Sequence, residues 1–230
     1  MDCFATELKR IDEINGRVPH FPRLLLEDIL SGMHPFAKDL LPILVLLPNQ
    51  GNVSETAYVM AAVSQLIGYH RLIHSRVMNV DTPESQRAVL LGDLLSSAAY
   101  KKMVEVYQDK NLMEIADVMA ATDEAWFMKE KLGQKESEAG YLEILQKEFG
   151  LLYGKIAAIG ADIAGLDEEK QDMYRTLGCR IGLLWGGKTN RYPIDFAAIS
   201  ASIDEQCVTL GQGVSQIVGN IKAEILSYGD

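Results

Sequence analysis

The sequence predicts an all-α protein, and two observations support that prediction. No proline occurs between Pro83 and Pro193, and strong helix formers such as Ala, Leu, Glu, Lys and Met dominate the residues between them. From Asn111 to Leu132 apolar residues recur at helical spacing, without the two-residue alternation of a strand. We therefore expect a single antiparallel helical bundle with a central cavity.

The expected elements follow from local signals along the chain. Prolines at positions 19, 22, 35, 42 and 48 divide the N-terminal part into shorter helices, and Asn49 to Asn52 is typical of a loop. Thr82 to Glu84 places proline and an acid in a first helical turn. Asp167 to Glu169 places carboxylates at another helix N-terminus. Helices are expected to begin near both.

Length and composition predict one domain over residues 1–230. The chain is 48% hydrophobic, and it contains neither a long polar linker nor a repeat of twenty to fifty residues. Its net charge of -10 leaves no basic stripe for a phosphate backbone, which argues against nucleic acid as a partner.

Cysteine usage and hydropathy predict a cytoplasmic protein without a transmembrane segment. The three cysteines, Cys3, Cys179 and Cys207, are odd in number and widely spaced, and no signal-peptide pattern begins the sequence. The longest apolar run, from Leu40 to Pro48, is too short to cross a bilayer.

Several stretches resemble the trans-prenyl diphosphate synthases. Residues 62–77 (AVSQLIGYHRLIHSRV) and 89–95 (VLLGDLL) are similar to the family's LIHDDVxD and VLLGDxLL, around its first aspartate-rich motif. Residues 141–165 resemble YLEIIxxKTAxLF followed by LGAILAG, and residues 177–185 resemble YGxxLGLAFQ, which leads to the second motif. Residues 38–44 are similar to GKRLRPLL. The order and spacing of these matches imply the isoprenoid-synthase fold for most of the chain.

The resemblance also shows what the chain lacks. The family holds magnesium with DDxxD carboxylates, whose i and i+4 members share one helix face. Aligned with these motifs, none of the six aspartates remains, and a cation at Arg76 would repel a dication. We expect no catalytic residue and no metal in this chain, with Mg²⁺ in a catalytic partner instead. The residues at the aspartate positions are Ser75, Arg76 and Asn79 in the first motif and Thr189, Asn190 and Pro193 in the second.

Most diphosphate contacts of the family are replaced as well. Its lysine-threonine pair becomes Glu148 and Phe149, the arginine of GKRLRP becomes Leu41, and its phenylalanine-glutamine pair becomes Trp185 and Gly186. Two basic residues stay as candidate residual phosphate contacts, namely Lys38 and Arg87.

Other polar residues receive structural interpretations. His70 and His74 have the i, i+4 spacing of zinc ligands, but no glutamate follows His70 as in HExxH and no third ligand is evident, so packed or hydrogen-bonded histidines are expected. Asp93 is interpreted as a capping or pairing carboxylate. The adjacent acids Asp123 and Glu124 are typical of a solvated helix surface. Cys179 has no neighbouring histidine to activate it and is assigned to the core.

The resemblance favours a non-catalytic small subunit (component 1) of a heteromeric heptaprenyl- or hexaprenyl-type diphosphate synthase. Such a chain would stabilise a DDxxD-bearing subunit in a heterodimer or heterotetramer and help set prenyl chain length, with respiratory quinones such as menaquinone as the end use. Tyr69 and His70, on the first-motif helix, are the candidate cavity residues.

Two other functions are compatible with the same scaffold. An inactive homodimer could bind an isoprenoid or another apolar ligand in the old substrate cavity. A diverged terpene-type enzyme with relocated chemistry is a third hypothesis, against which the missing carboxylates argue.

Overall fold

The computed structural model describes residues 4–17, 34–75, 82–106, 111–130 and 137–228. Every regular element in these ranges is a helix, which confirms the all-α prediction. The first helices are α1 (Ala5–Gly16), α3 (Leu40–Leu46), α4 (Glu55–His74), α5 (Pro83–Val106) and α6 (Leu112–Glu130). The later helices are α7 (Glu138–Leu145), α8 (Leu151–Ile163), α9 (Glu168–Asn190), α10 (Phe196–Leu210) and α11 (Gln212–Leu226). Two short 3₁₀ turns, η2 (Pro35–Lys38) and η3 (Leu47–Asn49), flank α3.

Helix starts lie where the local signals predict them. α5 begins at Pro83, and the Thr82 hydroxyl accepts a hydrogen bond from the backbone N–H of Ser85 at 3.2 Å. α9 begins after Asp167, whose carboxylate accepts from the N–H of Lys170 at 2.9 Å. Each cap satisfies one of the N–H groups that a first helical turn leaves unpaired.

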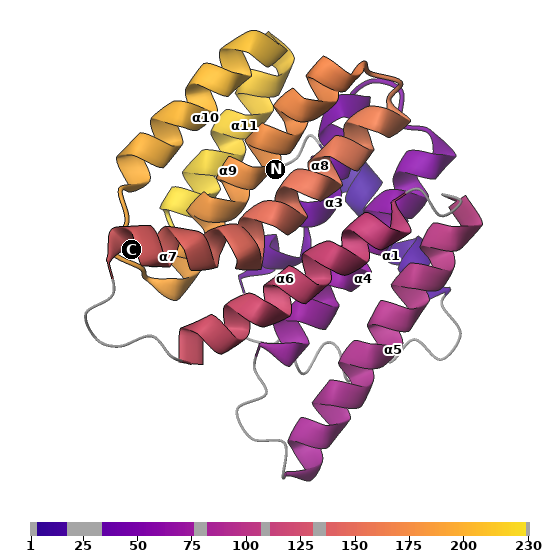
Figure 1. Ribbon diagram of the computed structural model, residues 1–230. Coiled ribbons are helices and arrows are strands. Elements are labelled where there is room, and N and C mark those ends of the chain that lie inside the picture. The colour runs from indigo at the N-terminus through magenta and orange to yellow at the C-terminus, as the bar shows by residue number, and fades with distance from the viewer. Residues whose placement is uncertain (1–3, 18–33, 76–81, 107–110, 131–136, 229–230) are drawn as a thin grey trace.

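The helices pack around one connected apolar core. Helix α4 lies between α3 and α5, while α8 packs along α9 and against α3. Buried side chains from Phe4 to Ile225 belong to a single cluster. In Figure 1, α5 stands at one edge of the bundle and the α10–α11 pair at the opposite edge. No helix in the described ranges combines the length and apolarity needed to cross a bilayer.

Glycines set the distance between α8 and α9. A Cβ atom at Gly178 would lie 2.5 Å from the backbone oxygen of Tyr153, and one at Gly182 would lie 2.9 Å from the Cβ of Tyr153. Both distances are shorter than van der Waals contact, so only glycine permits this approach.

A π-helical turn, η4 (Gln146–Gly150), connects α7 to α8 without a break in the helix. The turn contains Glu148 and Phe149, the two residues that stand at the lysine-threonine pair of the resembled family. Both side chains are buried. π-turns insert one extra residue per turn and occur often at functional sites.

Candidate functional site

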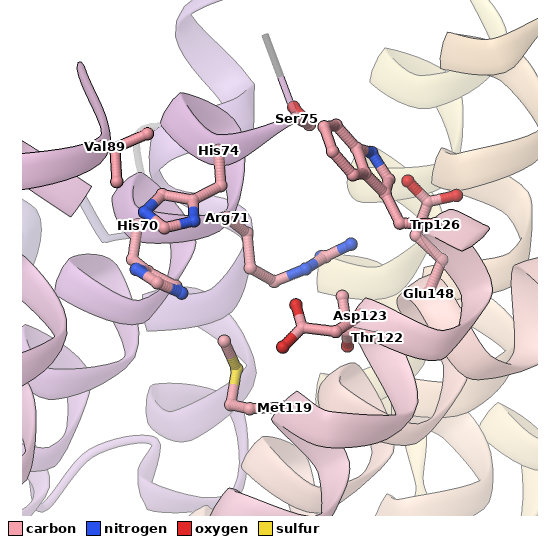
Figure 2. A pocket seen from close by; sticks show the side chains of 10 residues that line it. All are labelled: His70, Arg71, His74, Ser75, Val89, Met119, Thr122, Asp123, Trp126 and Glu148. Atoms are coloured by element: carbon pink, nitrogen blue, oxygen red, sulfur yellow. The ribbon is translucent and has the colours of Figure 1, made fainter. Parts of the chain in front are cut away.

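A cavity of about 240 Å³ lies between α4, α5, α6 and η4. Its wall on α4 includes Ser75, a residue of the degenerate first motif (Figure 2). Its lining combines apolar side chains with ionisable groups, which distinguishes it from a purely apolar pocket. The lining residues are His70, Arg71, His74, Ser75, Val89, Met119, Thr122, Asp123, Trp126 and Glu148.

Arg71 extends from α4 into this cavity, toward Asp123, Trp126 and Glu148 (Figure 2). Its guanidinium carbon lies 4.7 Å from the centre of the Phe149 ring, a cation–π contact. Burial lowers the pKa of Arg71, and Tyr153 and the carboxylates of Glu148 and Asp123 oppose that shift. The buried Nε of Arg71 has no hydrogen-bond partner among the described residues.

The two histidines of α4 lie against α5. Their ring centroids are 4.3 Å apart, and Nδ1 of His70 lies 3.0 Å from the carbonyl oxygen of Gly92. His74 Nε2 lies 3.5 Å from Oδ1 of Asp93. Burial lowers the pKa of His70, against the hydrogen bond to Gly92. The prediction of a hydrogen-bonded histidine is therefore confirmed for His70.

Lys129 of α6 joins two positions that are distant in sequence. Its ammonium lies 3.0 Å from each carboxylate oxygen of Glu148 and 3.0 Å from Oδ1 of Asn190 at the end of α9. The Glu148 side chain is 5% exposed and that of Lys129 is 23% exposed. The ion pair thus satisfies a carboxylate that is buried beside the cavity.

The other second-motif positions use their polar atoms within α9 or face solvent. The hydroxyl of Thr189 donates to the carbonyl of Trp185 at 2.9 Å, and the amide of Asn190 donates to Gly186 at 2.8 Å. Pro193 is exposed beyond the helix. In the first motif, Ser75 ends α4 and lines the cavity, while Arg76 and Asn79 lie outside the described residues.

The remaining predicted site residues are not gathered in the cavity, with one exception. His70 lines it, whereas Tyr69 is buried in the core, where burial and the carboxylates of Asp12 and Asp39 raise its pKa. Lys38 lies 3.7 Å from a carboxylate oxygen of Asp12 and 3.6 Å from one of Asp39. The last predicted contact, Arg87, is exposed on the N-terminal part of α5.

The cavity wall on α6 was missed at the sequence level. Thr122, Asp123 and Trp126 line it at helical spacing, and Met119 belongs to the same face. Asp123 and Glu124 are both exposed, as expected of a solvated acidic pair, and Glu124 lies 3.0 Å from Lys147, but Asp123 also lines the cavity. The i, i+3, i+4, i+7 pattern of these four residues was the available signal.

Comparison with known proteins relates this arrangement to one group of folds. No family model matches the chain. A geranylgeranyl diphosphate synthase of Methanosarcina mazei is 27% identical over 75% of this chain, which spans 63% of that relative's length. A decaprenyl diphosphate synthase structure from Rhodobacter capsulatus superimposes with a TM-score of 0.68 at 18% identity, over 82% of this chain and 63% of its own.

Two further structures match over nearly their whole length. The geranyl diphosphate synthase small subunit of Antirrhinum majus gives a TM-score of 0.69 at 19% identity, over 95% of this chain and 96% of that one. A heterotetrameric geranyl pyrophosphate synthase from mint, a deletion mutant, gives 0.66 at 16% identity, over 96% and 97%. The chain has the isoprenoid-synthase fold.

The described residues do not fit the magnesium ions that the trans-prenyl diphosphate synthase motifs hold. Mg²⁺ is bound through carboxylates and water, whereas Ser75, Thr189 and Asn190 offer two hydroxyls and an amide. The nearest buried carboxylate, Glu148, is paired with the ammonium of Lys129. The same ammonium also contacts Asn190 at the end of α9.

Proposed function

We propose that this chain is a non-catalytic small subunit of a heteromeric polyprenyl diphosphate synthase. The observation that carries the proposal is the contact of Lys129 with both Glu148 and Asn190. The resemblance places a phosphate-binding lysine at the first of these positions and a motif aspartate at the second. Lys129 neutralises the Glu148 carboxylate and occupies the space beside Asn190, so Glu148 is not free to hold Mg²⁺ and the site is unsuited to ionising an allylic diphosphate.

The extent of the structural likeness supports the same proposal. The match covers 96% of the snapdragon small subunit, compared with 63% of the decaprenyl diphosphate synthase. At these identities the likeness concerns the fold alone. The proposal requires that a small subunit of a heteromeric synthase share this scaffold, and the snapdragon small subunit does.

The distribution of exposed apolar side chains supports a protein partner. Of the seven large hydrophobic side chains exposed in the described ranges, five lie on α5 and α6, which contact each other. We call these five the α5/α6 patch: Leu90, Leu94, Val104, Met113 and Phe127. Single exposed apolar residues are ordinary, but their concentration on two adjacent helices is typical of an interface. We assign the DDxxD-bearing catalytic subunit as its occupant, in a heterodimer or heterotetramer.

In this proposal the chain acts through shape. It stabilises the catalytic subunit and helps to set product length by placing side-chain bulk near the partner's tunnel. Mg²⁺ is bound by the partner. The use of the product for respiratory quinone side chains follows from the resemblance to heptaprenyl- and hexaprenyl-type synthases.

The test is to purify the chain alone and after co-expression with the DDxxD-bearing homologue of the same organism. Prenyl transfer from isopentenyl and farnesyl diphosphates with Mg²⁺ is then measured, together with product length. We expect no turnover by the chain alone, co-purification with the partner, and a product length that depends on the complex. Aspartate-to-alanine changes in the partner's motifs should abolish the activity of the complex. Turnover by the lone chain would refute the proposal.

The same purified chain distinguishes the proposed subunit role from the alternative function, an inactive homodimer that binds an apolar ligand. Its specific support is the apolar part of the cavity lining, namely Val89, Met119 and Trp126. Tight binding of a prenyl ligand by a lone homodimer that ignores the catalytic homologue would favour it. The charged groups of Arg71, Asp123 and Glu148 in the same lining argue against it.

A further inference from the structure

Three metal-ligating side chains converge beside the cavity from two helices. His70 and His74 come from one face of α4, and Asp93 comes from α5. One ligand atom from each residue lies within 4.8 Å of those of the other two. We propose that His70, His74 and Asp93 form a binding site for a divalent transition-metal ion, with Zn²⁺ as the ion they suit.

The hydrogen bond of His70 occupies one ring nitrogen and leaves the other available to a metal ion. A carbonyl oxygen can only accept, so the 3.0 Å contact between Nδ1 of His70 and the oxygen of Gly92 places the ring hydrogen on Nδ1. The lone pair is then left on Nε2. Metal-bound histidines commonly donate their other ring nitrogen to a backbone carbonyl in this way, which fixes the tautomer and the ring orientation.

His74 supplies an independent observation. Its Nε2 is buried and lacks a hydrogen-bond partner in the part of the chain that the structure describes. The carboxylate oxygen Oδ1 of Asp93 lies 3.5 Å away, beyond good hydrogen-bond distance for a neutral ring. A buried nitrogen without a partner is unfavourable, and a cation between it and the carboxylate would satisfy both groups.

Gly92 leaves room for the His74 ring against α5. A Cβ atom at this position would lie 2.2 Å from Nε2 of His74. The His74 ring therefore occupies the space that the side chain of any other residue at position 92 would fill. The His74 imidazole thus lies against Gly92, the residue before Asp93. The proposed third ligand is therefore the next residue along α5.

The distances and ligand types select the ion. Tetrahedral zinc with bonds of about 2.0–2.2 Å holds its ligand atoms about 3.4 Å apart. The 3.5 Å between His74 and Asp93 already matches, and side-chain rotation can bring His70 closer. Two imidazoles favour zinc and related metals over magnesium. Because both histidines line the cavity, a remaining coordination position would face it.

The test uses the tag-free chain, treated with a chelator and dialysed, with ZnCl₂ titrated in a calorimeter. We expect one saturable site with micromolar or tighter affinity that excess Mg²⁺ does not displace. His74→Ala and Asp93→Ala should each weaken binding by at least about tenfold, since even supporting residues around a metal cost about 10- to 100-fold. Asp117→Asn, at an exposed position of α6 that does not line the cavity, is the matched control and should bind as the wild type does.

Cobalt substitution identifies the ligands. Co²⁺ should give ligand-field absorption without a thiolate charge-transfer band, which excludes the cysteines as ligands. Circular dichroism of each variant checks that the helices persist. The absence of saturable Zn²⁺ binding, or unchanged binding by both ligand variants, would overturn the proposal. Metal binding by the lone chain is measured without a partner, so this result is independent of the subunit role proposed above.

Discussion

The ammonium of Lys129 lies 3.0 Å from both carboxylate oxygens of Glu148, and this ion pair is buried on the Glu148 side. Nineteen positions separate these two residues in the sequence. A carboxylate this deeply buried requires a counter-charge, because desolvation would otherwise oppose its ionisation. The pair therefore stabilises the arrangement of η4, α6 and the end of α9.

Removing the lysine should destabilise the fold strongly. Lys129→Met leaves Glu148 charged and unpaired, which costs roughly 2–4 kcal/mol of unfolding free energy, somewhat less than for a fully buried pair because Lys129 is partly exposed. The double variant Lys129→Met/Glu148→Gln should recover most of that loss. Urea denaturation measures both. Lys170→Met, which removes an exposed pair with Asp167, is the control and should change stability by less than about 0.5 kcal/mol. Equal losses at positions 129 and 170 would contradict the buried-pair argument.

Alanine should have opposite effects at two glycines, one at the close approach of α8 and α9 and one on α11, where a Cβ has open space. Gly178→Ala places a Cβ 2.5 Å from a backbone oxygen of Tyr153, which cannot move without separating the helices, so a loss of about 1–3 kcal/mol is expected. Gly219→Ala meets nothing within 4 Å on α11 and should stabilise by about 0.5–1 kcal/mol through helix propensity. Thermal or urea unfolding compares them. A stabilising change at position 178 would be incompatible with the observed packing.

Features written into neighbouring residues could be predicted from the sequence. The starts of α5 and α9 follow from Pro83 and Asp167, because capping depends on atoms within one turn. The order of family-like segments also predicted the isoprenoid-synthase fold, which the structure comparisons confirm.

Features that depend on tertiary packing could not be predicted. The π-turn that contains Glu148 has no local sequence signature, and the contact of Lys129 with Asn190 joins residues 61 positions apart. Asp93 was interpreted as a capping or pairing carboxylate, and its partner could not be named because the distance from His74 is set by how α4 packs on α5. Sequence spacing shows only which residues share a face of one helix. It could not show that Asp93 of α5 lies beside His74 of α4.

Asp39 predicts a specific pH dependence. Burial raises the pKa of this carboxyl to about 6, with Lys38 opposing and Asp12 reinforcing the shift. Between about pH 4 and 6 the native state thus binds more protons than the unfolded state, so the contribution of Asp39 to stability is greatest below pH 4 and is lost as pH rises to 6. The Asp39→Asn variant carries no charge at this position, so it does not lose stability as the pH rises. It should be more stable than the wild type at pH 7 by roughly 1–3 kcal/mol.

The Asp39→Asn advantage should disappear below about pH 4, where the wild-type carboxyl is protonated in both states. Urea unfolding at several pH values measures the difference, and comparison with the wild type cancels all other titrations. Asp117→Asn, at an exposed position of α6, should show no such trend. A gain at position 39 that is the same at pH 3.5 and pH 7 would exclude burial of the charge as its cause.

Charged substitutions in the α5/α6 patch should weaken binding of the catalytic partner. Leu90→Glu and Phe127→Glu each place a carboxylate on a side chain that is more than half exposed in the lone chain, so the isolated fold should be retained. At an interface the same charge is desolvated, and binding of the catalytic homologue should weaken about tenfold or more. Val208→Glu on α10, at the opposite edge of the bundle in Figure 1, is the matched control. Affinity measured by surface plasmon resonance distinguishes them: equal weakening by all three variants, or none by the first two, would place the partner elsewhere.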